Sequence, residues 1–279
     1  MKYVGFCLFL LVLIVSPAQV LSQHKYIKKV DKYLSTGDRP KALTKLDQYI
    51  KKKSDMADLY LKRAKLKIEQ GDLGPAMLDI NTFCSLNRIC GEAEFLKGLI
   101  LYRQRNFLGA IEPLGEYTRK FDNADGWYYL ALSHMWIQNY SLAAHGFKRA
   151  IEAKSDQPDI FYNAGLASYY NNAFAKSDSL FGLAIQKNPQ DLDAMIAKSL
   201  ALSKMEAYAE SNKILRAVLD IDPSNGKALY NIGVNYYDLN ERDLACDYWS
   251  RSAELEHKEG EEAKMKYCGK KKKRKGRKK

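Results

Sequence analysis

The sequence predicts an all-α protein, built as an α-α superhelix of about seven helix–turn–helix repeats. Three observations predict this fold class. A pattern of small and large side chains returns about every 34 residues, and the apolar residues within each period follow helical spacings of three and four. Polar turn signals separate the periods, and there are only seven prolines in 279 residues. We therefore expect burial to be local and repeated, without one central core.

The stretch 226–259 shows the repeating unit most clearly. Leu229 and Tyr236 fall on one face of a first predicted helix, and Ala245 and Trp249 fall on one face of a second. A polar break at 240–241 separates the two helices. A pair of this kind cannot bury both apolar stripes by itself, so it needs similar pairs on either side.

Copies of this unit begin at residues 23, 57, 91, 124, 158, 192 and 226, and only the third is one residue short. The eighth position of each copy is small or of modest size: Val30, Ala64, Gly98, Ala131, Gly165, Ser199 and Gly233. The twenty-fourth position is large: Leu46, Ile80, Leu114, Phe147, Phe181, Leu215 and Trp249. This pattern predicts that the two helices of each pair approach closely at the eighth position.

Residues at fixed positions of these units also match a known repeat pattern: Trp127, Ala143, Phe147, Ala150, Gly165, Pro223, Gly233 and Tyr236. The pattern resembles the tetratricopeptide repeat, and the resemblance covers residues 23–259. The first three units depart from it, because they carry Tyr49, Phe83 and Tyr117 where the family has alanine. The resemblance implies a superhelix of helix pairs that binds other proteins and is not an enzyme. The lysine-rich style and the CDYW…KYC ending are similar to tetratricopeptide proteins of the Bacteroidetes cell envelope.

The N-terminal 22 residues differ from the repeats. Lys2 precedes an apolar run at 4–15, and Ser16 and Pro17 follow it. This order is typical of a secretory signal peptide, with cleavage expected before Gln23. The alternative is a membrane anchor, although the run is shorter than the roughly 20 residues that a spanning helix needs. We therefore expect export to the periplasm or the outer cell envelope.

The C-terminal end has two parts. Residues 260–268 form a predicted capping helix, acidic first and basic last, of the kind that a solenoid end requires. Residues 269–279 hold nine basic side chains in eleven, which predicts disorder. Removing these nine charges from the formal net charge of +12 leaves about +3 for the rest of the chain. The segment 270–279 is a candidate for binding an anionic membrane surface, or simply a solubilising tail. Nucleic acid is disfavoured as a partner, because export would separate the two.

Four cysteines remain once Cys7 of the apolar run is set aside. Cys84 and Cys90 lie symmetrically about a predicted turn, and so do Cys246 and Cys268. An even number in an exported chain favours disulfides within each pair, and the alternative is four reduced, buried thiols. A zinc site is disfavoured because there is no C-x2-C pair and the four histidines show no ligand clustering: His24, His134, His145 and His257.

No motif of enzyme or cofactor chemistry is present. The sequence lacks a Gly-rich phosphate loop, G-x-S-x-G and H-E-x-x-H, so we expect no catalytic residues and no cofactor. By resemblance to the family, the working surface is the inner wall formed by the first helix of each unit. The candidate groove residues are Phe95, Tyr102, Arg103, Tyr128, Met135, Trp136, Tyr162, Tyr169, Tyr170, Tyr230 and Tyr237.

These tyrosines have a second interpretation, because the family uses tyrosines at such positions for packing between units. Trp136 and Tyr170 are the stronger binding candidates, since their position need not be aromatic for packing. The family's carboxylate clamp is absent: Asn163 is in place, but Asp193 and Ala197 replace the basic pair. The expected function is a non-catalytic scaffold for a protein or peptide partner. The alternatives are surface association through the basic tail, or an accessory subunit of an envelope complex.

Overall fold

The structure, a computed structural model, describes residues 17–87 and 89–269. Every regular element in this part of the chain is an α-helix, as the sequence predicts. The predicted apolar run of the signal peptide and the basic segment 270–279 lie outside the described residues. The chain divides into two compact units, Met1–Lys120 and Phe121–Lys279, which are described separately below.

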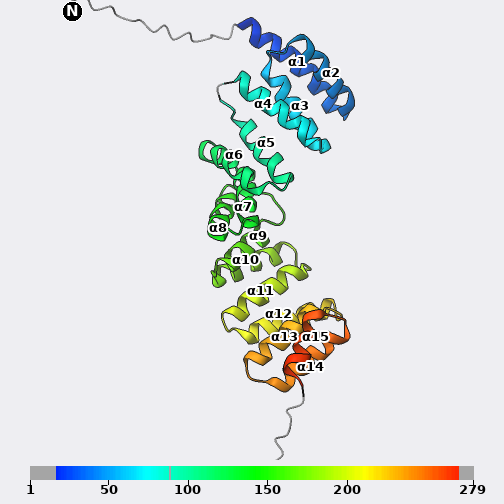
Figure 1. Ribbon diagram of the computed structural model, residues 1–279, viewed down its shortest axis with the longest axis vertical. Helices are drawn as coiled ribbons and strands as arrows, with labels where there is room; N and C mark the ends of the chain where they lie inside the picture. Colours follow the sequence, from blue (N-terminus) through cyan, green and yellow to red (C-terminus); the bar gives the residue numbers. More distant parts are fainter. Residues whose placement is uncertain (1–16, 88, 270–279) are drawn as a thin grey trace, which may run out of the picture. The chain divides into compact units, whose positions relative to one another are not determined.

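The first unit contains three successive helix pairs (Figure 1). Its helices are α1 (Pro17–Ser35), α2 (Arg39–Lys52), α3 (Ala57–Gln70), α4 (Leu73–Leu86), α5 (Glu92–Arg103) and α6 (Phe107–Lys120). Helix α1 starts inside the predicted signal peptide, and cleavage before Gln23 stays a prediction.

The second unit contains four helix pairs and one further helix (Figure 1). The pairs are α7 (Ala124–Trp136) with α8 (Tyr140–Glu152), α9 (Ile160–Tyr170) with α10 (Phe174–Lys187), α11 (Leu192–Lys204) with α12 (Tyr208–Ile221), and α13 (Gly226–Asp238) with α14 (Arg242–Glu254). Helix α15 (Lys258–Tyr267) follows, at the place of the predicted cap.

The two helices of a pair meet where the sequence alternates small and large residues. A Cβ atom on Gly165 would lie 2.7 Å from Cε1 of Phe181, and one on Gly233 would lie 2.5 Å from Cδ1 of Trp249. No real Cβ contact is that short, so only glycine allows these helices to approach as they do. All seven large residues at the twenty-fourth position are at most 2% exposed. In these pairs the small residue of the first helix therefore makes room for the buried large residue of the second.

The turn inside each pair uses the same backbone geometry. One residue takes a positive φ, and the N–H of the next residue donates to the carbonyl five residues back, which is the Schellman closure of a helix. The first two turns use Gly37 and Gly71 at this residue. The other five use residues with a side chain: Arg105, Gln138, Asn172, Glu206 and Asn240.

A buried charge network connects three helices of the first unit. Arg63 of α3 donates Nε and Nη2 to the two carboxylate oxygens of Asp79 at 2.9 and 2.6 Å, and Lys67 Nζ adds a contact at 2.8 Å. Asp79 of α4 is 3% exposed, so the two cations compensate its burial. Arg63 also reaches Asp47 of α2 at 2.6 Å. The hydrogen bonds to Asp79 raise the pKa of Arg63 above its usual value.

In the described part of the chain, no helix combines the length and the apolar character needed to cross a membrane.

Candidate functional site

Two exposed aromatic residues end the first helices of successive repeats in the second unit. Trp136 is the last residue of α7 and is 55% exposed, and Tyr170 is the last residue of α9 and is 52% exposed. Both occupy the thirteenth position of their repeat, directly before the turn. Because successive first helices pack side by side, we expect the two rings at equivalent places on one surface.

Tyr170 belongs to an aromatic cluster, which we define as Tyr140, Tyr169, Tyr170 and Phe174. The rings of Tyr140 and Tyr170 are stacked with centroids 5.0 Å apart, and Tyr169 meets Tyr170 edge-on at 5.6 Å. Phe174 meets Tyr169 at 5.5 Å. Ring contacts of this kind add stability beyond simple burial and hold the exposed ring of Tyr170 in place.

A hollow of about 370 Å³ lies beside this cluster, at the turns that follow α7 and α9. It is lined by Gln138, Asn139, Tyr140, Ser141, Leu142 and Asn171. The walls mix amide groups with one aromatic ring and one leucine. Such a wall can hydrogen-bond a peptide backbone while an apolar side chain contacts Tyr140.

Tyr128 has a structural role instead. It is 5% exposed, and its hydroxyl donates to Oδ1 of Asp159 at 2.6 Å. Asn163 donates Nδ2 to the other carboxylate oxygen of Asp159 at 2.8 Å. Asn163 and Tyr128 thus both donate hydrogen bonds to the Asp159 carboxylate. Tyr128 therefore packs between repeats and is not an exposed groove residue. Met135 is half-buried against the same local core.

Tyr162 borders a cavity of about 510 Å³ at the start of α9 and α11. Its ring lies 5.8 Å from that of Phe181, so one side of it is fixed by packing. Burial raises the pKa of Tyr162, and the nearby charges of Asp193 and Asp191 raise it further. The hydroxyl therefore stays protonated and can donate a hydrogen bond at the edge of an acidic cavity.

The last two candidate residues of the second unit pack against its C-terminal helices. The ring of Tyr237 lies 4.8 Å from Tyr267 of α15 and 5.5 Å from Trp249 of α14. The ring of Tyr230 lies 5.7 Å from His257. Through these contacts Tyr230 and Tyr237 hold the capping helix in place, so both residues serve packing, as in the second interpretation of the tyrosines.

The three candidates of the first unit also have partners within that unit. The ring of Phe95 lies 5.3 Å from Tyr117, and that of Tyr102 lies 5.5 Å from Phe107. Arg103 donates Nη1 to the carbonyl of Ile68 at 2.9 Å, so its cation sits at the C-terminal end of α3.

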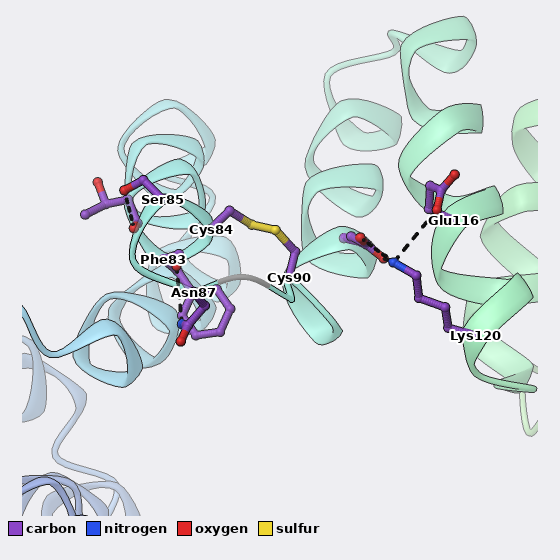
Figure 2. The surroundings of a disulfide bond; sticks show 9 residues. Phe83, Cys84, Ser85, Asn87, Cys90, Glu116 and Lys120 are labelled. Carbon is purple, nitrogen blue, oxygen red and sulfur yellow. Dashed lines mark hydrogen bonds and ion pairs between the residues drawn. A yellow bond between two sulfur atoms is a disulfide. The ribbon is translucent and has the colours of Figure 1, made fainter. Parts of the chain in front are cut away.

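Both predicted cysteine pairs are brought together. The Cα atoms of Cys84 and Cys90 are 5.1 Å apart, those of Cys246 and Cys268 are 5.6 Å apart, and the sulfur atoms are joined in each pair. Both distances lie in the range of disulfides. Figure 2 shows the first pair between the end of α4 and the start of α5, where Asn87 donates to the carbonyl of Phe83 at 3.3 Å.

Among the residues that the structure describes, no three histidine, cysteine or acidic side chains come together as a metal site. The hollows described above carry aromatic and polar groups suited to a peptide chain.

Comparison with known proteins gives the repeat its name. Residues 95–158 match the family model of the tetratricopeptide repeat. This central stretch is therefore similar to the tetratricopeptide repeat. A curated relative, the Protein SGT1 homolog of Bos taurus, is 26% identical over 188 residues. That alignment covers 67% of this chain and 52% of the relative, so the chain spans about half the length of the curated relative it matches.

Two solved structures show the same tetratricopeptide fold. The C-terminal part of a repeat protein from Cytophaga hutchinsonii is 18% identical, with a TM-score of 0.63, and the match covers 84% of this chain and 98% of that one. YrrB, described as a TPR protein with an unusual peptide-binding site, is 18% identical with a TM-score of 0.51. That match covers 79% of this chain and 97% of YrrB. At these identities the likeness establishes the fold alone.

Sequence reasoning missed two features of these repeats. Tyr140 was not among the candidates, although it stacks on Tyr170. A signal for it exists, because the seventeenth position is aromatic in four successive repeats: Phe107, Tyr140, Phe174 and Tyr208. The bond from Tyr128 to Asp159 was also missed, because it joins positions 31 residues apart that no single-helix pattern connects.

Proposed function

We propose that the protein is a non-catalytic scaffold that binds a partner protein or peptide through the first helices of its second unit. Tetratricopeptide repeats are protein–protein interaction modules. The observation that carries the proposal is the pair of exposed aromatic residues, Trp136 and Tyr170, at the same position of successive repeats. YrrB, which has a peptide-binding site on this fold, offers a precedent for such a surface.

The exposed rings supply enough apolar surface to act as binding anchors. An aromatic side chain buries about 150–250 Å² when fully covered. Trp136 and Tyr170 are each about half exposed, so covering each remaining surface contributes about 2 kcal/mol at 25 cal/mol per Å². Contributions of this size are those of interface hot spots. Tyr170 is also held in place by Tyr140, so little side-chain freedom is lost on binding.

Cross-linking in the native host, followed by mass spectrometry, tests this function. We expect a partner whose recovery falls strongly in Trp136→Ala with Tyr170→Ala, while the thermal unfolding of the variant matches wild type. Leu183→Ala is the control, because Leu183 is 41% exposed and lies on a second helix, α10, and not on the first helices that carry the two anchors. If wild type, the anchor variant and the control all cross-linked to the same partners, the proposed binding surface would be wrong.

Export to the periplasm or the outer envelope is part of the same proposal. It rests on the order of charge, apolar run and small residues in the first 22 residues. Mass spectrometry of the mature protein should give Gln23 as the first residue. A mature chain that keeps residues 1–22 would instead make the segment an anchor.

The two disulfides are consistent with the proposed export, because disulfides form and persist in oxidising compartments. Alkylation of the native protein without reductant should label none of Cys84, Cys90, Cys246 and Cys268, and alkylation after reduction should label all four. Four labelled thiols before reduction would exclude both bridges.

A second candidate function rests on the nine basic side chains at 269–279. In it the tail attaches the protein to an anionic surface and the solenoid is a spacer or an accessory subunit of an envelope complex. Deleting residues 270–279 distinguishes the two. A scaffold keeps its cross-linked partner, whereas a tail-driven protein loses its place at the envelope.

A further inference from the structure

A small apolar cavity lies between α8, α9 and α10 of the second unit, and neither Trp136 nor Tyr170 lines it. Its volume is about 270 Å³. Helix α8 supplies Ala144 and Ile151, α9 supplies Ala164, and α10 supplies Leu180, so the walls are almost wholly hydrocarbon. The charged residues at the cavity are Lys148, Glu152 and Lys176.

The repeat register explains why a cavity exists here. Ala144 and Ala164 are position 21 of one repeat and position 7 of the next. One step further along, these positions hold Asp178 and Lys198, whose Oδ1 and Nζ atoms are 2.5 Å apart. Within each unit the other steps also carry larger pairs: Leu43 with Arg63, Met77 with Lys97, and Asn212 with Ile232.

The space is thus left by two alanines where the equivalent sites have larger side chains. Ile232 occupies the same position in α13 and is fully buried, so an isoleucine can be accommodated at position 7. The side chains that line an empty apolar cavity lack the van der Waals contacts that a larger neighbouring residue would supply. We take the cavity as a place for an apolar group from outside the chain, as apolar cavities in proteins accept such groups.

The charges at the rim favour an anion. Glu152 is shared between Lys148, at 3.6 Å, and Arg149, at 3.7 Å. Lys176 has no ion pair within the described part of the chain and is exposed beside the cavity. Two lysines against one already shared carboxylate leave the rim positive. A carboxylate at the mouth would gain a charge-assisted hydrogen bond from Lys176.

We propose that this cavity binds a medium-chain fatty acid, with its hydrocarbon tail between Ala144 and Ala164 and its carboxylate at Lys176 and Lys148. The volume corresponds to about nine water molecules of roughly 30 Å³ each, which suits a short tail and is too small for a long lipid chain. The site is independent of the proposed partner surface, because it uses none of the residues of that surface.

Octanoate titrated into the full-length protein tests the site, with binding measured by calorimetry and located by the methyl resonances of Ile151 and Leu180. We expect saturable binding to wild type and its loss, by about tenfold or more in affinity, in Ala164→Ile. Ala144→Ile is a second filling variant, so the test does not depend on one substitution folding. Ala175→Ile is the matched control, because it adds the same side chain at an exposed position of α10.

The charge requirement is tested separately with octanol, which has the same tail but no carboxylate. Lys148→Gln with Lys176→Gln should weaken octanoate about fivefold and leave octanol unchanged. Lys187→Gln is the control, because this lysine lies over the Phe161 ring at 4.8 Å and does not line the cavity. The proposal is overturned if wild type does not bind octanoate, or if the folded filling variants bind it as wild type does. Equal affinity for octanol and octanoate in wild type would also overturn it.

Discussion

Replacing Gly165 tests the physical basis of the whole repeat. In an open helix, Gly→Ala stabilises a protein by about 1 kcal/mol, because alanine has the higher helix propensity. At Gly165 the new Cβ would meet the ring of Phe181 at 2.7, 2.8 and 3.0 Å. Phe181 is fully buried, so its ring cannot swing away into solvent. The helices or the ring must therefore move.

The magnitude follows from two opposing effects. Overpacking a filled site costs about 1–3 kcal/mol, and the propensity gain offsets about 1 kcal/mol of it. We expect Gly165→Ala to lower the free energy of unfolding by about 1 kcal/mol, and Gly165→Leu to lower it by at least about 3 kcal/mol. Gly182→Ala on the facing helix is the matched control. Its Cβ would meet only Lys198 Nζ, at 3.6 Å, so it should stabilise by up to about 1 kcal/mol.

Urea unfolding followed by circular dichroism measures both changes. The Gly165→Ala and Gly182→Ala midpoints should move in opposite directions. Combining Gly165→Ala with Phe181→Leu should recover part of the loss, because the smaller side chain makes room, and the coupling should exceed about 0.5 kcal/mol. If Gly165→Ala raised the midpoint as much as Gly182→Ala, or if Gly165→Leu unfolded like wild type, close helix approach would not be what holds the repeats together.

Three further predictions come from buried or strained residues. Asp79→Asn should lower the free energy of unfolding by about 3 kcal/mol in urea titrations, because Arg63 and Lys67 both lose the buried carboxylate that they contact, and only Arg63 keeps another, Asp47. Burial lowers the pKa of His134 below 6.5, so the folded state binds fewer protons than the unfolded state. The contribution of His134 to the free energy of unfolding should therefore be full above pH 6.5 and should fall as the pH drops below it. His134→Gln should flatten this dependence of stability on pH. Glu206→Gly should raise the free energy of unfolding by about 1 kcal/mol, and with it the melting temperature, because the φ of 61° at this residue suits glycine better than glutamate.

The first and the third of these predictions have matched controls. Glu69→Gln removes an exposed ion pair with Arg39 and should change stability by less than about 1 kcal/mol. Gly71→Ala should destabilise, since φ is 85° there. Equal effects in a test variant and its control would contradict the corresponding explanation.

The repeat could be predicted from sequence because its cause is local and periodic. Gly165 and Phe181 lie 16 residues apart in one repeat, and the same spacing returns in every copy, so the pattern itself predicts the all-α fold. The turn signals were weaker, because five of the seven positive-φ residues in the turns inside the helix pairs are not glycine. Backbone hydrogen bonds, which sequence does not display, close those turns.

The binding surface was harder to predict, since aromatic residues serve packing and recognition alike. Tyr128 and Tyr170 are both tyrosines on first helices of neighbouring repeats, yet one is 5% exposed and the other 52%. Tyr128 is at the fifth position of its repeat, and its hydroxyl donates a hydrogen bond to Asp159 of the next repeat, whereas Tyr170 is at the thirteenth position, at the end of its helix. Likewise, no periodic pattern marks Asp79 as buried, but it is 3% exposed and accepts hydrogen bonds from Arg63 and Lys67. Such pairings depend on contacts between helices.

The uniform hairpin turns have a practical consequence for engineering. Because main-chain hydrogen bonds define each turn, the tip residues contribute little to the core and their chemistry can vary without altering helix registration. A fluorophore or affinity handle placed at Glu206 or Asn240 would report on the protein from a defined distance along its second unit. The repeat period thus gives evenly spaced attachment points along the second unit, from which the binding of a partner can be measured.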